Sequence, residues 1–186
     1  MFLIQCLLIY KMNTEKKLAS ISKLLKIMDI LRKECPWDQK QTFESLRPLT
    51  LEETYELIDA IENKNINEIK HELGDLLLHV IFYSKIASES NYFDISDVAD
   101  SITKKLIFRH PHVFENRSPI DEKQVKNNWE KLKLKEGNKS ILSGVPKSLP
   151  SILKAIRIQK KVSNVGFEWE DISDVKHKIY EEIEEL

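Results

Sequence analysis

The chain contains two short acidic segments, Leu51-Glu-Glu-Thr-Tyr-Glu-Leu57 and His71-Glu-Leu-Gly-Asp-Leu76, each inside an apolar helical pattern. In each segment two acids lie three residues apart, so they share one helix face. A turn separates the segments, so their helices can pack antiparallel and bring the acids together. Close carboxylates repel one another unless a cation lies among them, and all-oxygen sites suit Mg²⁺, which usually accompanies phosphates. The candidate metal ligands are Glu53, Glu56, Glu72 and Asp75.

Other interpretations of these acids stay open. A solvated acidic face is common on charged helices, although neither pair has the Lys or Arg at i+4 that would relieve its repulsion. Thr50 and Glu53 also match a capping box, in which Glu53 would bond to the backbone and not to a metal. Gly74 costs its helix about 1 kcal/mol relative to Ala. It allows close helix approach, leaves room for a ligand, or has no role.

Composition narrows the class of protein. A chain of 186 residues has room for one domain and part of another. The net charge of −1 provides no basic field for nucleic acid, so we expect no nucleic-acid partner. Cys6 and Cys35 form no metal-binding or redox spacing, which fits a reduced compartment such as the cytoplasm.

Apolar residues recur at helical spacing in four segments, and no segment alternates convincingly as a strand. Abundant Lys, Glu, Ile and Leu with scarce Gly and Pro also favours helices. The predicted class is therefore all-α, a helical bundle. The segments are 18–31, ending before Pro36; 51–61, after Pro48; 69–88; and 95–106, stopped at Pro111.

The predicted domain organisation has four parts. Residues 1–17 read as an N-terminal extension, disordered or a mis-called start, with Met12 as a more natural first residue. Their apolar run is too short to span a bilayer and is a poor signal peptide, so a membrane anchor is the minority interpretation. Residues 18–115 form the first domain. Residues 116–150 form a linker helix, around Val125, Trp129 and Leu132, and a loop; 151–186 begin a second domain.

The end of the chain repeats the first acidic motif. Glu181, Glu182 and Glu185 have the spacing of Glu52, Glu53 and Glu56, and both copies follow a helix and a Trp-bearing loop. The repetition indicates an internal duplication. No Glu-x-x-Asp helix follows the second copy, so we expect it to hold half a metal site.

Two further sets of residues are candidates for binding a nucleotide. Lys105 and Arg109 are spaced to clamp phosphate, although a basic helix C-terminus is itself stabilised by the helix dipole. Trp37 could stack on a base and Lys40 could meet phosphate, although a loop Trp is more often a core plug. His110 and His112 lack a third soft ligand for zinc. His71 and His79 are expected at helix surfaces or boundaries.

Taken together, these segments closely resemble the MazG family of nucleoside triphosphate pyrophosphohydrolases, from about Leu18 onward. In the first half, the matching motifs are Cys35-Pro-Trp-Asp38, Leu51-Glu-Glu-Thr-Tyr-Glu-Leu57, Glu72-Leu-Gly-Asp-Leu-Leu77 and Arg109-His-Pro-His-Val-Phe114. In the second half they are Val165-Gly-Phe-Glu-Trp169 and Tyr180-Glu-Glu-Ile-Glu-Glu185.

The resemblance implies a MazG-like all-α fold, with a homodimer or higher assembly whose core is built by helices from both chains. It implies hydrolysis of a nucleoside triphosphate to the monophosphate and pyrophosphate with Mg²⁺, for which Mn²⁺ could substitute. Within the family pattern, the ligands would be Glu53, Glu56, Glu72 and Asp75. Glu52 or a ligand carboxylate would take the proton, and the sequence does not choose between them.

The second acidic motif is complete in two-domain members of the family, but here it is cut off after Leu186. The competing interpretation is therefore an inactive helical dimerisation or regulatory remnant. The first motif is complete, which favours the enzyme.

Overall fold

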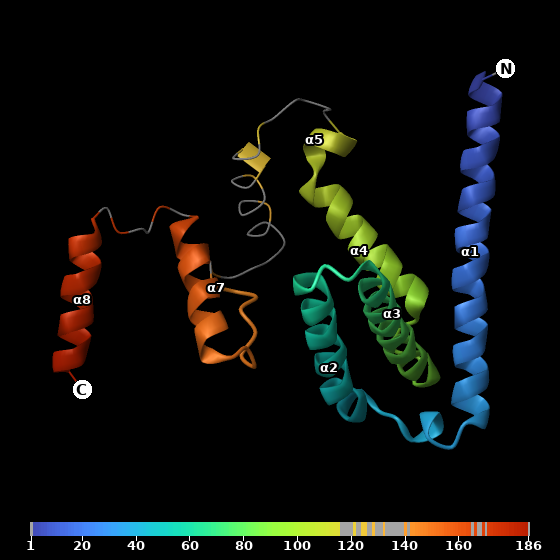
Figure 1. Cartoon of the computed structure of the whole chain (residues 1–186), viewed down its shortest axis with the longest axis horizontal. Coiled ribbons are helices and arrows are strands. Elements are labelled where there is room, and N and C mark those ends of the chain that lie inside the picture. The colour runs from blue at the N-terminus through green and yellow to red at the C-terminus, as the bar shows by residue number, and fades with distance from the viewer. Residues whose placement is uncertain are drawn as a thin grey trace. The chain divides into compact units, whose positions relative to one another are not determined.

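The computed structural model contains helices and turns and no strand among the residues that it describes, which confirms the all-α class (Figure 1). The chain divides into two compact units, Met1–Ile102 and Thr103–Leu186, and each is described by itself. The predicted domain boundaries stay predictions. The described residues are 2–115, with side chains from residue 13, and then 121, 124–125, 128, 132, 140, 142–164, 166, 169 and 171–185.

The first helix, α1 (Phe2–Glu34), is longer than the apolar pattern of residues 18–31 predicts and includes the segment expected as an extension. Basic Arg32 and Lys33 lie in its last turn, where they complement the helix dipole. Pro36 follows, and proline disfavours helical geometry at the residue before it. None of the described helices combines the length and apolar character needed to cross a membrane.

The second helix, α2 (Phe43–Glu62), begins earlier than predicted. Thr42 and Ser45 form a reciprocal capping box: Ser45 N donates to Thr42 Oγ1 at 3.2 Å and Thr42 N donates to Ser45 Oγ at 2.8 Å. Pro48 consequently lies inside the helix, where it lacks the N–H that would bond to Glu44. The prediction that the helix starts after Pro48 is wrong because the capping interaction upstream fixes the start.

The third helix, α3 (Ile66–Glu89), packs against α2 after a short turn. Asn65 caps α3 by accepting hydrogen bonds from Asn67 N and Glu68 N at 3.2 and 3.3 Å. The turn also uses Lys64 in the left-handed region, with φ of 54°. This geometry provides the reversal between α2 and α3 that the acidic motifs require.

The core of the first unit lies where α1, α2 and α3 meet. Met28, Leu46, Ile81 and Phe82 are its buried side chains, and apolar residues including Leu24 and Leu78 pack against them. Two ion pairs also join α1 to α3: Arg32 with Glu89 at 2.9 Å, and Asp29 with Lys85 at 2.8 Å.

The fourth helix, α4 (Ile95–Arg109), ends just before Pro111, and the short α5 (Pro111–Phe114) follows. In the second unit, α7 (Ser151–Ser163) and α8 (Ile172–Glu184) are helical. Asp171 caps α8 by accepting from Ser173 N at 2.7 Å. Trp129, on the predicted linker helix, lies outside the described residues, as do Gly137, Val165, Phe167 and Glu168.

Candidate metal centre

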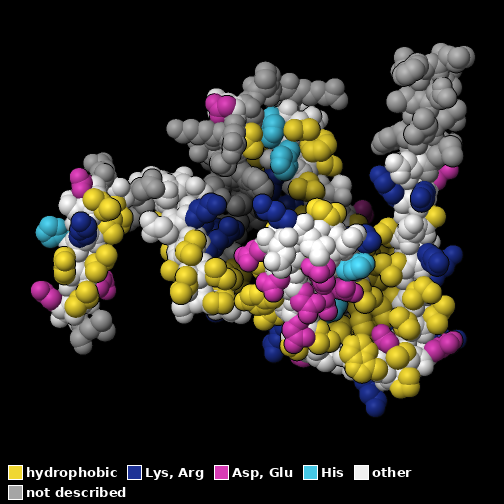
Figure 2. Space-filling model, viewed as in Figure 1, with side chains coloured by type: hydrophobic (Ala, Val, Ile, Leu, Met, Phe, Trp, Pro, Cys, Tyr) yellow, Lys and Arg dark blue, Asp and Glu magenta, His cyan; other side chains and the backbone are white. Residues whose placement is uncertain are grey.

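The antiparallel helices α2 and α3 bring three of the predicted ligands together. Glu53, Glu56 and Glu72 each offer a carboxylate oxygen, and these oxygens all lie within 4.8 Å of one another. Acidic side chains gather over α2 and α3, with hydrophobic side chains beside them (Figure 2). This is the convergence that the i, i+3 spacing on facing helices predicts.

The fourth predicted ligand, Asp75, lies outside this close group but within its electrostatic reach. Its negative charge raises the pKa of both Glu53 and Glu72. Asp75 is one turn along α3 from Glu72, on the same face. The four carboxylates therefore interact electrostatically, and three of them lie closer together.

Burial and the shared negative charge raise the pKa of two members of the group, Glu53 and Glu72. Partial burial raises the pKa of Glu53, and Asp75, Glu56, Glu72 and Glu52 raise it further, in that order. The pKa of Glu72 is also raised, first by burial, then by Glu56 and Asp75, while His71 opposes the shift. Glu56 also hydrogen-bonds Glu72, which favours the protonated form of Glu72. A cation bound among these carboxylates would relieve their mutual repulsion.

Glu53 is not used as a helix cap. The residue that would be its capping partner, Thr50, lies inside α2, and the Thr50 hydroxyl donates to the Leu46 carbonyl at 3.0 Å. The capping-box interpretation of Thr50 and Glu53 is therefore wrong, because the true cap is formed by Thr42 and Ser45. The Glu53 carboxylate therefore has no capping role and lies beside its acidic neighbours.

A buried histidine, not foreseen from the sequence, lies on the same helix as two of the acids. His79 is only 7% exposed, so its predicted place on a helix surface is wrong. Its Nδ1 lies 2.6 Å from Thr50 Oγ1, which also lies 2.7 Å from the Tyr83 hydroxyl. Burial lowers the pKa of His79, while Asp75 opposes the shift. No local pattern signals this burial, because the hydrogen-bond partner Thr50 lies 29 residues away in the chain.

The predicted base- and phosphate-binding residues Trp37 and Lys40 lie on the connector between α1 and α2. Trp37 immediately precedes a turn of 3₁₀ helix, η1 (Asp38–Lys40), and Lys40 is the last residue of that turn. Trp37 is 54% exposed, so its interpretation as a core plug is wrong. Lys40 is also exposed. Both belong to the same unit as the acidic group but to a different element.

The predicted phosphate clamp, Lys105 and Arg109, lies in the last part of α4 and belongs to the second unit. This unit is described by itself, so the clamp is placed on α4 alone. His110 follows, with Nδ1 2.7 Å from the Leu106 carbonyl. A role for Lys105 and Arg109 in phosphate binding stays a prediction.

The second acidic copy differs from the first in its charge partners. Lys178 lies 2.6 Å from Glu181 and 3.3 Å from Glu182 along α8, and Glu185 follows at the helix end. The hydrogen bond to Glu181, followed by that to Glu182, raises the pKa of Lys178. In the second copy a lysine therefore offsets the charges of the acids. In the first copy the corresponding acids converge on one another.

The fold and the site define an all-α protein with an all-oxygen acidic group suited to a divalent cation. Residues 41–114, which include all four predicted ligands, match the MazG nucleotide pyrophosphohydrolase domain. The chain is 44% identical over 173 residues to the nucleoside triphosphate pyrophosphohydrolase of Escherichia coli K12, covering 89% of this chain and 66% of that protein. It is 45% identical over 169 residues to the Thermotoga maritima nucleoside triphosphate pyrophosphohydrolase/pyrophosphatase MazG, covering 88% and 65%.

The chain therefore belongs to the MazG family. It spans just under two thirds of the length of these relatives. The crystal structure of a MazG-related protein from Thermotoga maritima is similar in fold, with a TM-score of 0.54 and 22% identity over 61% of this chain and 98% of that one.

Proposed function

We propose that this chain hydrolyses nucleoside or deoxynucleoside triphosphates to the monophosphate and pyrophosphate. The observation that carries the proposal is the convergence of Glu53, Glu56 and Glu72 within 4.8 Å, with Asp75 in electrostatic reach. The names of the relatives support it, because proteins that match most of this chain are called nucleoside triphosphate pyrophosphohydrolases. They favour the enzyme over an inactive regulatory remnant.

The donor set fits Mg²⁺, with Mn²⁺ able to substitute. Every candidate ligand offers carboxylate oxygen, the donor that hard divalent cations prefer. When bound, the cation would polarise phosphate oxygens and lower the pKa of a bound water. Glu53, Glu56, Glu72 and Asp75 would hold it. Glu52, or one of those carboxylates, would accept the proton of the attacking water.

Basic and aromatic residues outside the acidic group would bind the rest of the nucleotide. Lys105 and Arg109, with Lys40, would neutralise charge along the phosphate chain. Trp37 presents a half-exposed indole on which a base could stack. These roles rest on the residue types and their exposure, and the KM of single substitutions at each position tests them.

A homodimer or higher assembly would complete the fold. Large apolar side chains stay exposed on both helices that carry the acids, with Leu51 58% and Leu73 52% exposed. Tyr55 and Ile58 on α2 and Val80 on α3 are exposed as well. Apolar surface of this extent beside the acidic group is typical of an interface between chains. Sedimentation of the purified chain at several concentrations tests this, and a concentration-independent monomer would refute it.

The proposed role is removal of unwanted nucleotides from the cytoplasmic pool, with a nucleoside triphosphate as the substrate. The test is to incubate the chain with mixed ribo- and deoxyribonucleoside triphosphates, with Mg²⁺ and then with a chelator, and to separate the products by chromatography. Monophosphate and pyrophosphate formed only with Mg²⁺ support the proposal. A folded chain that makes neither product would overturn it.

A further inference from the structure

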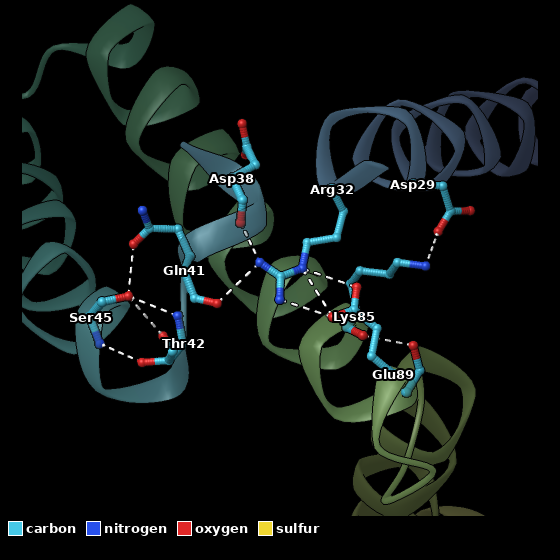
Figure 3. A network of polar contacts seen from close by, with 9 residues as sticks. Asp29, Arg32, Asp38, Gln41, Thr42, Ser45, Lys85 and Glu89 are labelled. Atoms are coloured by element: carbon cyan, nitrogen blue, oxygen red, sulfur yellow. Dashed lines mark hydrogen bonds and ion pairs between the residues drawn. The ribbon is translucent and has the colours of Figure 1, made fainter. Parts of the chain in front are cut away.

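A single arginine joins three elements of the first unit. Arg32, in the last turn of α1, donates from Nε and Nη2 to the Glu89 carboxylate at the end of α3, at 2.9–3.1 Å. Its Nη1 donates to the backbone carbonyls of Asp38 and Gln41 on the connector, with 3.1 Å to Gln41 O. Figure 3 shows the guanidinium between α3 and the connector. Arg32 thereby attaches the connector, defined as residues 35–42, to the end of α3.

The shape of the guanidinium is essential to this bridge. One edge of the planar group meets a carboxylate while its far nitrogen meets two carbonyls, so the donors are used in two directions. The Arg32 side chain is 12% exposed, and its Cζ lies 5.8 Å from the centroid of the buried Phe82 ring. A lysine at this position would keep the charge, but its compact ammonium lacks the fork.

The connector itself is a hydrogen-bonded turn. Gln39 Nε2 donates to the Lys33 carbonyl at 2.5 Å, and Gln41 Nε2 donates to the Trp37 carbonyl at 3.0 Å. Gln41 also accepts from Ser45 Oγ at 2.7 Å, which ties the turn to the start of α2. This ordered turn nevertheless leaves the Trp37 indole 54% exposed.

From these contacts we infer that Arg32 is a positioning residue for nucleotide binding. It holds the connector against the end of α3, so that Trp37 and Lys40 are presented in a fixed orientation to a nucleoside triphosphate. Arg32 does not touch the nucleotide; it acts through the connector backbone. The inference rests on the proposed function, since it assigns the connector to the same substrate.

The test compares Arg32→Lys with Lys85→Met. The control removes the other ion pair between α1 and α3, Lys85 with Asp29, and leaves the connector contacts intact. Steady-state kinetics and hydrogen exchange of the connector amides are measured for both. In a background with Trp129 and Trp169 replaced by Phe, nucleotide-dependent quenching of Trp37 reports binding directly.

We expect Arg32→Lys to raise KM about tenfold, a change that corresponds to the free energy of one charge-assisted hydrogen bond. The kcat should stay within about twofold of the parent value. Its connector amides should exchange faster, while Mn²⁺ binding to the chain, followed by electron paramagnetic resonance, stays unchanged. Glu89→Gln, which keeps an acceptor oxygen but no charge, should give a smaller change in the same direction. Lys85→Met should match the parent in KM.

Three outcomes would overturn the inference alone. One is an unchanged KM and connector exchange in Arg32→Lys; another is an equal rise of KM in Lys85→Met. The third is a parent chain that turns over substrate while Trp37 fails to respond to nucleotide, which would leave the proposed function standing. A parent with neither turnover nor quenching would overturn both.

Discussion

Thr50 Oγ1 on α2 lies 2.6 Å from His79 Nδ1 on α3, and each of these residues is one helical turn from an acid, Glu53 and Asp75 respectively. The Thr50 oxygen also lies 2.7 Å from the Tyr83 hydroxyl and donates to the Leu46 carbonyl at 3.0 Å. Because the Thr50 hydroxyl donates its one proton to the Leu46 carbonyl, its oxygen accepts hydrogen bonds from both His79 and Tyr83. This hydroxyl therefore fixes how the two acidic helices are joined beside the candidate metal centre.

Replacing Thr50 by Val should lower the free energy of unfolding by about 1–3 kcal/mol, because it leaves the buried His79 and its neighbour Tyr83 without their partner. Thr50→Ser keeps the hydroxyl and should cost clearly less. Urea unfolding followed by circular dichroism measures both. Equal stability of the Val and Ser variants would show that the hydroxyl does not join the helices.

Asp75→Asn should lower turnover by at least about 100-fold, the upper range found even for outer-shell partners of metal ligands. The side chain keeps its size, so helical content should be unchanged. Product formation and far-ultraviolet circular dichroism are measured together. Glu62→Gln, on the exposed end of α2, is the control and should keep full turnover. A fully active Asp75→Asn chain would remove Asp75 from the metal site.

Glu72→Gln should stabilise the metal-free chain at neutral pH. The pKa of Glu72 is raised in the folded state, so its stabilising contribution is present below the ordinary Glu pKa and is lost as pH rises through the folded value. Gln resembles the protonated form at every pH. The advantage of the variant should therefore vanish below about pH 4.3, the ordinary Glu pKa.

Urea unfolding in chelator across this pH range tests the Glu72 prediction. Glu15→Gln, on an exposed part of α1, is the matched control and should show no comparable gain at neutral pH. A Glu72→Gln chain less stable than the parent at neutral pH would contradict the repulsion on which the candidate metal centre rests. Added Mg²⁺ at 100 times its dissociation constant should stabilise the parent by about 2.7 kcal/mol.

Gly74→Ala should stabilise the chain by about 1 kcal/mol through helix propensity. A Cβ at Gly74 would meet nothing within 4 Å, so close approach of another described element does not account for the glycine. Thermal unfolding measures the gain, and turnover of the same sample shows whether the open space beside Gly74 is used. A stabilised but inactive variant would indicate that a ligand or a second chain needs the space, whereas unchanged turnover would indicate that Gly74 has no role.

Much of the fold could be predicted from local sequence patterns. The 3.6-residue period of apolar positions located α3 and α4, and Pro111 marked the end of α4 correctly. The start of α2 was missed because Pro48 is the stronger local signal, while the side chains of Thr42 and Ser45 determine the real start. The pair of short-range hydrogen bonds at the cap therefore determines where the helix starts, despite the single proline inside it.

The candidate site was predicted only in part, because some of its features depend on contacts between residues that are distant in the chain. The i, i+3 spacing of Glu53 with Glu56 is local, so the sequence indicates the shared face before the helices are placed. The burial of His79 depends on Thr50, which is 29 residues away in the chain. Such a contact forms only when α2 packs on α3, and no pattern within either helix specifies it.

The sequence by itself determined the helical class, the order of the helices and the acidic pairs, because these follow from backbone geometry within a few residues. Only the tertiary structure decided that Glu53, Glu56 and Glu72 converge within 4.8 Å, and that the Trp37 indole is exposed while His79 is buried. Exposure and convergence depend on which surfaces meet, and that is set by contacts between residues distant in the chain.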